Sequence, residues 1–493
     1  MSKVFLVGAG PGDAELLTLK GRRVLELANA VLYDHLANPA LLRFAPPTAE
    51  RVYVGKKRSI HAFSQDEIIA MMVERARRGL TVVRLKGGDP FIFGRGGEEV
   101  EGLAAAGVEY EVVPGVTTPL GIAAYTGVPL THREHTSVVT FVTGHDPEAI
   151  DWSRTGLTGT VVVFMGLQHL GEVAVRMIAA GRSPDTPAMA VRWSTRPDQR
   201  TITGRLADLR QLVESSGMLP PVTIVIGEVV SLREKLTWFE KRPLHGRVII
   251  VTRPELQAAE LSDPLRDLGA EAVELPVIEL APMSDYAALD ACIAQLEEYD
   301  WIVLTSVNAV QYFLRRVWDC LRDARAIRGS LCAIGPATVN ALAAANLRAD
   351  LVPEESIAEG VAAAFASVDL QGKRVLLPRA SAAREVIPQA LEAMGARVDV
   401  ADAYRNIIPM DAETRVRAWL ASGKRADWIT FTSGSTVKNW LALAGRESLE
   451  GVRIASIGPA TSDVVRKHGL EVHAEALPYT VNGLVAAVVA ATY

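Results

Sequence analysis

The sequence contains little cysteine. Cys292, Cys320 and Cys332 are its only three cysteines in 493 residues, and their spacing matches no metal-binding pattern. An odd, scattered set of this kind predicts reduced thiols and a cytoplasmic protein, not a disulfide framework. Long apolar runs are also missing, and the short one after Lys3 is too brief for a signal peptide or a membrane span. We therefore expect no association with a membrane.

An excess of positive charge is absent as well. The chain has 52 Lys and Arg against 57 Asp and Glu, and residues 1–240 are balanced at 26 of each sign. A nucleic-acid-binding protein carries a basic patch or stripe, so we expect no nucleic-acid partner. An anionic small molecule would have to be held by local basic groups and backbone amides.

The remaining composition is that of a globular α/β protein. Apolar residues make up 49% of a chain that is too long for a single hydrophobic core, which predicts two or more domains. Apolar runs that end in glycine turns, such as KVFLVGAG, VRLKGGD and TVVVFMG, alternate with helical patterns. A charged segment with Pro and Gly, TWFEKRPLHGR, then precedes a fresh strand. We predict one domain over residues 1–240, a linker over 241–247 and a second domain over 248–493.

The second half of the chain contains an internal repeat. The segment DWIVLTSVNAV begins at Asp300, and DWITFTSGSTV begins 127 residues later at Asp427. VIIVTRPE at 248 and VLLPRASA at 375 keep the same spacing, and IGPAT also occurs twice. Two copies are too few for a solenoid. The repeat predicts two similar α/β lobes with a cleft between them for a small molecule.

A glycine turn, GAGPGD, follows the first predicted strand. It differs from a dinucleotide-binding turn, because Asp13 stands where a third glycine is needed and Pro11 lacks an amide donor. This counts against an NAD-linked oxidoreductase, which is one alternative for the chain. The turn suits a neutral or cationic ligand better, although a plain strand-to-helix turn would look the same.

A second glycine-rich run extends from Arg84 to Glu99 and reads RLKGGDPFIFGRGGEE. Adjacent glycines let a ligand approach the backbone closely, and Asp89 could accept hydrogen bonds from an amine or a ribose. GGDP alone could be only a β-turn. Arg84, Lys86 and Arg95 suggest a flexible basic rim that binds substrate carboxylates.

Hydroxyl side chains follow predicted strands in the repeated half. Thr305 and Ser306 in one copy correspond to Thr432 and Ser433 in the other. Near helix N-termini, such hydroxyls and free amides can bind anionic groups. They can equally well cap the helices, and the two roles are compatible.

Residues 1–240 contain a set of ordered segments: VGAGPGDAELLTLKG, LYDHL, VGKK, RLKGGDPFIFGRGGEE, VVPGVTT, GVPLTHR, FVTGH and VVFMGL. Together these segments resemble the tetrapyrrole methylases, most of all uroporphyrinogen-III C-methyltransferase. The resemblance implies a two-lobed, usually dimeric enzyme. It would transfer two methyl groups from S-adenosyl-methionine to uroporphyrinogen III, giving precorrin-2 and S-adenosyl-homocysteine.

The resemblance also implies roles for single residues. Asp34 in LYDHL matches a proposed proton acceptor and Lys56 in VGKK a proposed donor, although Asp34 could instead cap a helix and Lys56 bind a carboxylate. The implied cofactor contacts are Pro11, Gly87, Gly88, Asp89, Ile92, Thr117, Thr118, Met165 and Ser194. The last of these departs from the family, which often has glycine there.

Residues 246–493 resemble uroporphyrinogen-III synthase through VTRP, TSVNAV, IGPAT, DAYRN, FTSGSTV and SIGPATSDVVRKHGL. The resemblance implies two flavodoxin-like lobes that close hydroxymethylbilane into a ring and invert its last pyrrole, with loss of water and without cofactor or metal. Tyr404 in DAYRN matches a tyrosine thought to hydrogen-bond the departing hydroxyl, and Thr461 matches a substrate contact. From the repeat alone, we infer that Arg253 and Arg379 bind substrate carboxylates.

The combined expectation is a bifunctional tetrapyrrole enzyme that binds small molecules and acts as a homodimer through its methylase domain. Three alternatives remain beside the oxidoreductase. The C-terminal half could be only a tetrapyrrole-binding module, the methylase could act on a later corrin, and Tyr404 could be a satisfied aromatic between the lobes. Because the chain starts at the methylase, we do not expect the precorrin-2 dehydrogenase found in some related fusions.

Overall fold

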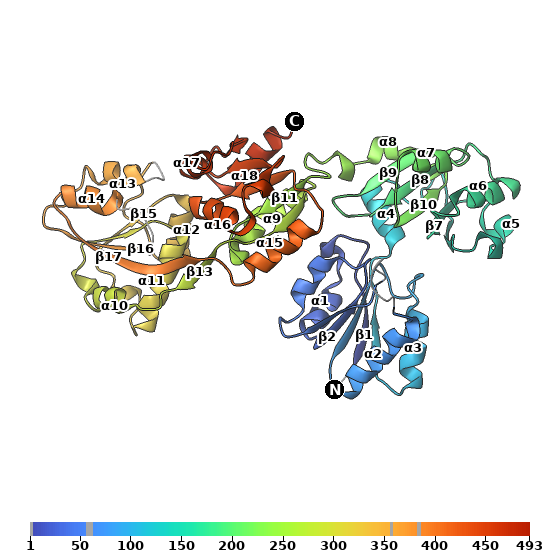
Figure 1. The fold of residues 1–493 in the computed structure, drawn as a ribbon, viewed down its shortest axis with the longest axis horizontal. Helices are drawn as coiled ribbons and strands as arrows, with labels where there is room; N and C mark the ends of the chain where they lie inside the picture. Colours follow the sequence, from blue (N-terminus) through green and yellow to red (C-terminus); the bar gives the residue numbers. More distant parts are fainter. Residues whose placement is uncertain (1–2, 56–62, 355–357, 382–385) are drawn as a thin grey trace. The chain divides into compact units, whose positions relative to one another are not determined.

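The computed structural model describes residues 3–55, 63–354, 358–381 and 386–493. The chain divides into two compact units (Figure 1). One comprises residues 1–249, 263–272 and 492–493, and the other 250–262 and 273–491. The linker at 241–247 stays a prediction. Across the described ranges, no helix is both long and apolar enough to cross a membrane.

The first unit begins with a parallel five-stranded sheet in the order β3-β2-β4-β1-β5. The strands are β1 (Val4–Gly8), β2 (Ala30–Tyr33), β3 (Glu50–Tyr53), β4 (Val82–Lys86) and β5 (Tyr110–Val113). The chain leaves β1 toward β2 and leaves β4 toward β5, in opposite directions across the sheet. Ligands bind at such a switch point, beyond the carboxyl ends of the strands, so the ends of β1 and β4 mark the place for a site.

Helices cover both faces of this sheet. They are α1 (Leu19–Glu26), α2 (Gln65–Arg77) and α3 (Gly96–Ala105). Alternate residues of a strand point to opposite faces: Val7 packs with α1, whereas Leu6 packs with α2 and α3. Figure 1 shows α1 on one side of the strands and α2 and α3 on the other.

A second, mixed sheet in this unit has the order β6-β7-β10-β8-β9. Its strands are β6 (Val139–Thr143), β7 (Thr160–Phe164), β8 (Pro187–Arg192), β9 (Arg200–Arg205) and β10 (Val222–Ile226), and its helices are α4 (Thr118–Thr126), α5 (Trp152–Thr155), α6 (Leu170–Ala179), α7 (Leu209–Ser215) and α8 (Arg233–Leu236). Both β7 and β8 are antiparallel to β10. They therefore run in the same direction, and their carboxyl ends lie at the same edge of the sheet.

Two more five-stranded sheets follow in the C-terminal half, in the orders β12-β11-β18-β19-β20 and β13-β17-β16-β14-β15. The first contains β11 (Val248–Val251), β12 (Glu271–Glu274), β18 (Trp428–Phe431), β19 (Arg453–Ser456) and β20 (Ala474–Glu475). The second contains β13 (Glu279–Pro282), β14 (Trp301–Leu304), β15 (Ser330–Ala333), β16 (Arg374–Ala380) and β17 (Arg397–Ile407). The helices are α9 (Glu255–Asp267), α10 (Ala287–Ala294), α11 (Val307–Asp319), α12 (Pro336–Ala344), α13 (Ala358–Phe365), α14 (Val386–Ala393), α15 (Ala412–Ala421), α16 (Gly434–Ala444), α17 (Pro459–Lys467) and α18 (Val481–Ala490).

The predicted repeat is confirmed in the strand order. Strands β12-β11-β18-β19 of one sheet correspond to β17-β16-β14-β15 of the other. The two lobes are not consecutive stretches of chain, however. Residues 279–407 form one sheet, whereas the other is built from strands before and after them. The repeat spacing could not show this, because it reports which segments are alike and not which segments pair.

Candidate functional site

The first candidate site lies at the carboxyl ends of β1 and β4. Gly10 and Gly88 exchange backbone hydrogen bonds of 3.2 and 2.8 Å, so the two glycine turns are held side by side. A Cβ atom on Gly8 would lie 2.5 Å from the Cα atom of Gly115, beyond β5. No side chain fits between these turns, and the absence of a Cβ lets the three backbone segments approach one another closely.

Asp89 ties the second glycine turn to the segment after β5. Its carboxylate accepts hydrogen bonds from the backbone N–H of Phe91 at 2.9 Å and of Gly115 at 3.0 Å. Thr117 and Thr118 follow at the start of α4, and the Thr118 hydroxyl lies 3.5 Å from the place of a Cβ on Gly88. The residues predicted to bind the cofactor in these three segments thus share one edge of the sheet.

The second sheet completes this edge. The backbone N–H of Asp13 donates to the Thr195 hydroxyl at 2.7 Å, and a Cβ on Gly12 would lie 2.6 Å from the Ser194 carbonyl oxygen. The rings of Phe93 and Phe164 are 4.9 Å apart. The first two contacts place the turn that carries Pro11 beside the segment after β8. The ring contact places the loop that carries Ile92 beside the end of β7, and Met165 is the next residue after β7.

Backbone strain gathers in the same segments. Seven non-glycine residues in the described part of the chain have a positive φ angle, and five of them are Phe93, Arg95, Met165, Trp193 and Thr195. A left-handed conformation at such residues costs about 1–2 kcal/mol and is concentrated at ligand sites. Sequence reasoning missed Trp193 and Thr195, because nothing in a non-glycine residue type signals a positive φ.

Asp34 lies directly after β2, near the end of β4. One carboxylate oxygen accepts from the backbone N–H of Leu36 at 3.0 Å, and the other is paired with the guanidinium of Arg84 at 3.0 Å. The helix-capping alternative is wrong, since the next helical turn is capped by Asn38. Asp34 therefore faces the site as an ion-paired carboxylate that is 23% exposed.

The predicted basic rim needs a correction. Arg84 and Lys86 are each only 4% exposed, and both pair with the fully buried Glu99, at 3.1 and 2.8 Å. They lie on the central strand β4, whose residues are all buried, so they cannot form an exposed rim. Burial, followed by the charge of Arg84, lowers the pKa of the Lys86 ammonium. Arg95 alone of the three predicted residues is at the surface, paired with Glu98 at 3.0 Å. Lys56 lies outside the described residues.

The second candidate site surrounds Tyr404 on β17. The Tyr404 ring stacks on Tyr312 with 5.2 Å between centroids, and its hydroxyl lies 3.3 Å from that of Ser306. Ser306 also caps α11 by accepting from the Ala309 N–H at 3.1 Å. Two residues predicted as functional, 98 positions apart, are thus brought together, and Thr305 immediately precedes one of them.

Most of the other predicted residues of this half lie at equivalent places in the second copy of the repeat. Ser433 caps α16 just as Ser306 caps α11, with Thr432 before it, and Thr461 is 5% exposed at the start of α17. The guanidinium of Arg253 pairs with Glu260 at 2.9 Å, and its side chain is 11% exposed. The hydroxyl of Thr461 and the Arg253 guanidinium therefore offer little open surface in this conformation.

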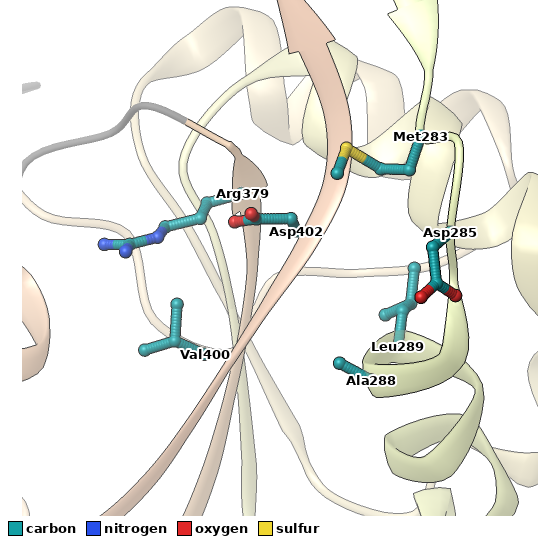
Figure 2. A pocket seen from close by; sticks show the side chains of 7 residues that line it. All are labelled: Met283, Asp285, Ala288, Leu289, Arg379, Val400 and Asp402. Atoms are coloured by element: carbon teal, nitrogen blue, oxygen red, sulfur yellow. The ribbon is translucent and has the colours of Figure 1, made fainter.

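Arg379 lines a pocket of about 390 Å³ at strand β17 (Figure 2). The other lining residues are Met283, Asp285, Ala288, Leu289, Val400 and Asp402. Figure 2 shows Arg379 on one side of β17 and Asp285 with Leu289 on the other. Two carboxylates accompany the single guanidinium, so the pocket is not a purely anion-binding one. Across the described ranges, no group of three or more His, Cys, Asp or Glu is arranged to hold a metal ion.

Comparison with known proteins identifies a family for each half of the chain. Residues 3–210 match the family model described as Tetrapyrrole (Corrin/Porphyrin) Methylases, and residues 259–486 match Uroporphyrinogen-III synthase HemD. The porphyrin biosynthesis protein HemD of Ruminiclostridium josui is 36% identical over 473 residues, 95% of this chain and 94% of that protein. The chain belongs to the family of fused tetrapyrrole methylases and uroporphyrinogen-III synthases.

Two further relatives match a smaller part of the chain. The uroporphyrinogen-III C-methyltransferase of Bacillus subtilis is 38% identical over 338 residues, 67% of this chain and 69% of the relative. The siroheme synthase of Chromobacterium violaceum is 50% identical over 242 residues, 48% of this chain, and the match covers 52% of that protein. The fused enzyme thus acts in tetrapyrrole biosynthesis, with S-adenosyl-methionine as its methyl donor. The predicted family and fold are confirmed.

Proposed function

We propose that the C-terminal half of the fused enzyme cyclises hydroxymethylbilane to uroporphyrinogen III, and that the N-terminal half methylates this product twice to precorrin-2. The match to a relative over 95% of the chain supports keeping both activities in one polypeptide. The observation that carries the methylation step is the ion-paired Asp34 beside the two joined glycine turns.

The glycine edge fits S-adenosyl-methionine. The cofactor, when bound, supplies an electrophilic methyl group on a sulfonium. Asp89 uses two hydrogen bonds to brace the turns and retains lone pairs for ligand hydroxyl or amino groups. The Ser194 hydroxyl is buried without a hydrogen-bond partner, and a ligand group would satisfy it. We assign cofactor contacts to Pro11, Gly87, Gly88, Asp89, Ile92, Thr117, Thr118, Met165 and Ser194.

Asp34 would take the proton that methylation releases. A new methyl group on a pyrrole carbon leaves positive charge on the macrocycle, and loss of a proton restores neutrality. The guanidinium of Arg84 holds this carboxylate in place through an ion pair of 3.0 Å. Lys56 remains the proposed proton donor.

Exposed apolar side chains next to these turns would hold the macrocycle. Leu36, Phe91, Phe93 and Met165 are between 42% and 56% exposed, although each is large and apolar. Groups of this kind mark ligand sites. Arg95 at the same loop would bind a carboxylate of the substrate.

The proton-acceptor role predicts that Asp34→Asn lowers kcat for methylation about 100-fold or more at saturating uroporphyrinogen III. Affinity for S-adenosyl-methionine should change little, because the substitution keeps the shape of the side chain. Stopped-assay rates and calorimetric titration with the cofactor measure the two quantities. Turnover near that of the wild type would rule out Asp34 as the acceptor.

In the synthase half, Tyr404 would hydrogen-bond the hydroxyl that departs from hydroxymethylbilane, with Ser306 orienting the phenol. A phenol can stabilise a leaving oxygen while staying neutral itself. Thr305, Thr432, Ser433, Thr461, Arg253 and Arg379 are proposed to bind the substrate. Its carboxylates would be the natural partners of the two arginines.

One coupled experiment tests both halves together. The purified chain is given hydroxymethylbilane and S-adenosyl-methionine, and products are separated by isomer and by number of methyl groups. A dimethylated product of the type III series is expected. If only uroporphyrinogen III added from outside is methylated, and hydroxymethylbilane yields the type I isomer, the C-terminal half is not a synthase.

We also propose a cytoplasmic homodimer that binds no nucleic acid. The methylase resemblance supports the dimer, and Leu19 and Leu27 of the α1 segment, 89% and 64% exposed, offer apolar contacts. Cys292, Cys320 and Cys332 are free thiols, and free thiols are compatible with a reducing compartment. Light scattering coupled to gel filtration measures the mass, and a single-chain mass at micromolar concentration would contradict the dimer.

A further inference from the structure

Glu99 on helix α3 is a fully buried carboxylate outside the predicted cofactor contacts. One of its oxygens accepts three hydrogen bonds, from Gln65 at 2.8 Å, Arg84 at 3.1 Å and Lys86 at 2.8 Å. Its other oxygen is buried and has no hydrogen-bond partner. Glu99 therefore joins the two buried cations of β4, and it is the carboxylate that both of them contact.

The cluster continues to the candidate active site through one side chain. Arg84 donates to Glu99 through Nε and to Asp34 through Nη2, at 3.1 and 3.0 Å, and its Nη1 donates to the Leu85 carbonyl at 3.0 Å. The guanidinium is thus fixed in its plane by partners on three sides. Of the four charged groups, only Asp34 reaches solvent to a sizeable extent, at 23% exposure.

Stability alone does not account for such a cluster. Removing charged side chains from water is expensive, and apolar residues of similar volume serve a core as well or better. A buried network that ends on a proposed proton acceptor is instead typical of residues that fix the position and charge of a functional group.

We propose that Glu99 is a positioning residue for the methylation reaction, holding Arg84 against Asp34 and balancing the charge of Lys86, so that Asp34 accepts the released proton readily. This inference rests on the proposed role of Asp34. Glu99 acts through Arg84 and does not touch substrate or cofactor.

The charged and titratable groups that face the cluster determine how loss of the Glu99 charge would change the surroundings of Asp34. On the described elements these are Arg84 and Lys86 of β4, Asp34 after β2, Tyr53 on β3 and Glu98 beside Glu99 on α3. Burial, followed by Asp34, raises the pKa of the Tyr53 phenol, so it stays neutral at ordinary pH. Loss of the Glu99 charge leaves two cations opposite one carboxylate.

The test is Glu99→Gln, assayed for methylation of uroporphyrinogen III across a range of pH. Loss of the Glu99 charge makes the surroundings of Asp34 more positive, so the acidic limb of the kcat profile should move to lower pH. Because a weaker base accepts the proton more slowly, the plateau of kcat should fall about three- to tenfold. KM should stay within about twofold, since Glu99 does not contact the substrate.

A second variant separates charge balance from damage to the fold. In Lys86→Met/Glu99→Gln, one cation and one anion are removed together, and the acidic limb should return to its wild-type position. Glu101→Gln is the matched control, because Glu101 is exposed on the same helix α3. It should leave the profile, the melting temperature and the affinity for S-adenosyl-methionine unchanged.

Three outcomes are decisive. A Glu99→Gln profile that coincides with the wild type, or a double variant whose acidic limb stays displaced, overturns the positioning role. Loss of activity in parallel with cofactor affinity and melting temperature, with the limb in place, shows a structural role only. If Asp34→Asn turns over normally, the proton-acceptor assignment itself fails, whichever result Glu99→Gln gives.

Discussion

The close approach of three glycines makes Gly8 a precise place to perturb the methylase. Gly8 does not have a positive φ angle, so alanine can adopt its backbone conformation and the only change is the added Cβ. That atom would lie 2.5 Å from both Cα and N of Gly115 and 2.7 Å from the Gly88 carbonyl oxygen. All three neighbours are backbone atoms, and none can rotate out of the way.

The size of the effect follows from these distances. Non-bonded carbon atoms pack at about 3.5–4.0 Å, so the ends of β1, β4 and β5 would have to separate by about 1 Å. Overpacking of this kind costs roughly 1–3 kcal/mol, and the upper end applies because the backbone itself must move. A displacement of about 1 Å at a reacting centre lowers rates about 100-fold. We therefore expect kcat/KM for methylation to fall about 100-fold in Gly8→Ala.

Calorimetric titration of the cofactor and an assay of the methylation rate test this prediction. Calorimetric titration should show at least a tenfold weaker affinity for S-adenosyl-methionine, the change expected when backbone contacts shift by about 1 Å. Cyclisation of hydroxymethylbilane by the same preparation provides an internal control and should not change.

Gly97→Ala is the matched substitution. A Cβ on Gly97 would meet no atom within 4 Å, so this helical variant should be neutral or up to about 1 kcal/mol more stable. Wild-type cofactor affinity and stability in Gly8→Ala would refute the role given to the glycine contact.

Two further predictions concern other parts of the chain. Tyr404→Phe removes the hydroxyl that lies 3.3 Å from Ser306; it should raise the share of type I product from hydroxymethylbilane, measured by isomer separation, and an unchanged ratio would count against Tyr404. Lys20 and Lys3 hold the pKa of Glu111 at about 2, below its ordinary value. Its ion pairs therefore stabilise the fold above about pH 4.5 and cease to do so as the pH falls toward 2. Glu111→Gln should be less stable than the wild type by under about 1 kcal/mol at pH 7, and denaturant titrations should find this difference vanishing in acid. A difference that persists at pH 2 would contradict the assignment.

The sequence predicted much of the fold because its signals are local. Apolar runs that end in glycine locate β1 and β4, and their turns meet at the switch point of the sheet. The repeat also predicts that Ser306 and Ser433 cap equivalent helices. Both residues do so, and both have a φ of −162°. Patterns within about ten residues determine such features.

Features that depend on contacts between residues far apart in the chain could not be predicted from the sequence. Arg84 looked like a surface cation beside a glycine loop, and only the sheet order shows that it lies on a central strand, opposite Asp34, 50 residues away. Glu99 lay in the quoted motif without a role, because its partners are assembled by α2 and β4. The burial of charged groups is decided by neighbours that no single motif contains.

The interleaved strands of the synthase half have a mechanical consequence. The lobe of residues 279–407 is inserted within the other, and the strands at its entry and exit, β13 and β17, pair with each other at Glu279 and Ile407. The chain therefore enters and leaves the inserted lobe side by side, through one pair of strands. Truncation of the polypeptide after residue 407 would keep all strands of the inserted lobe and remove three of the five strands of the other lobe.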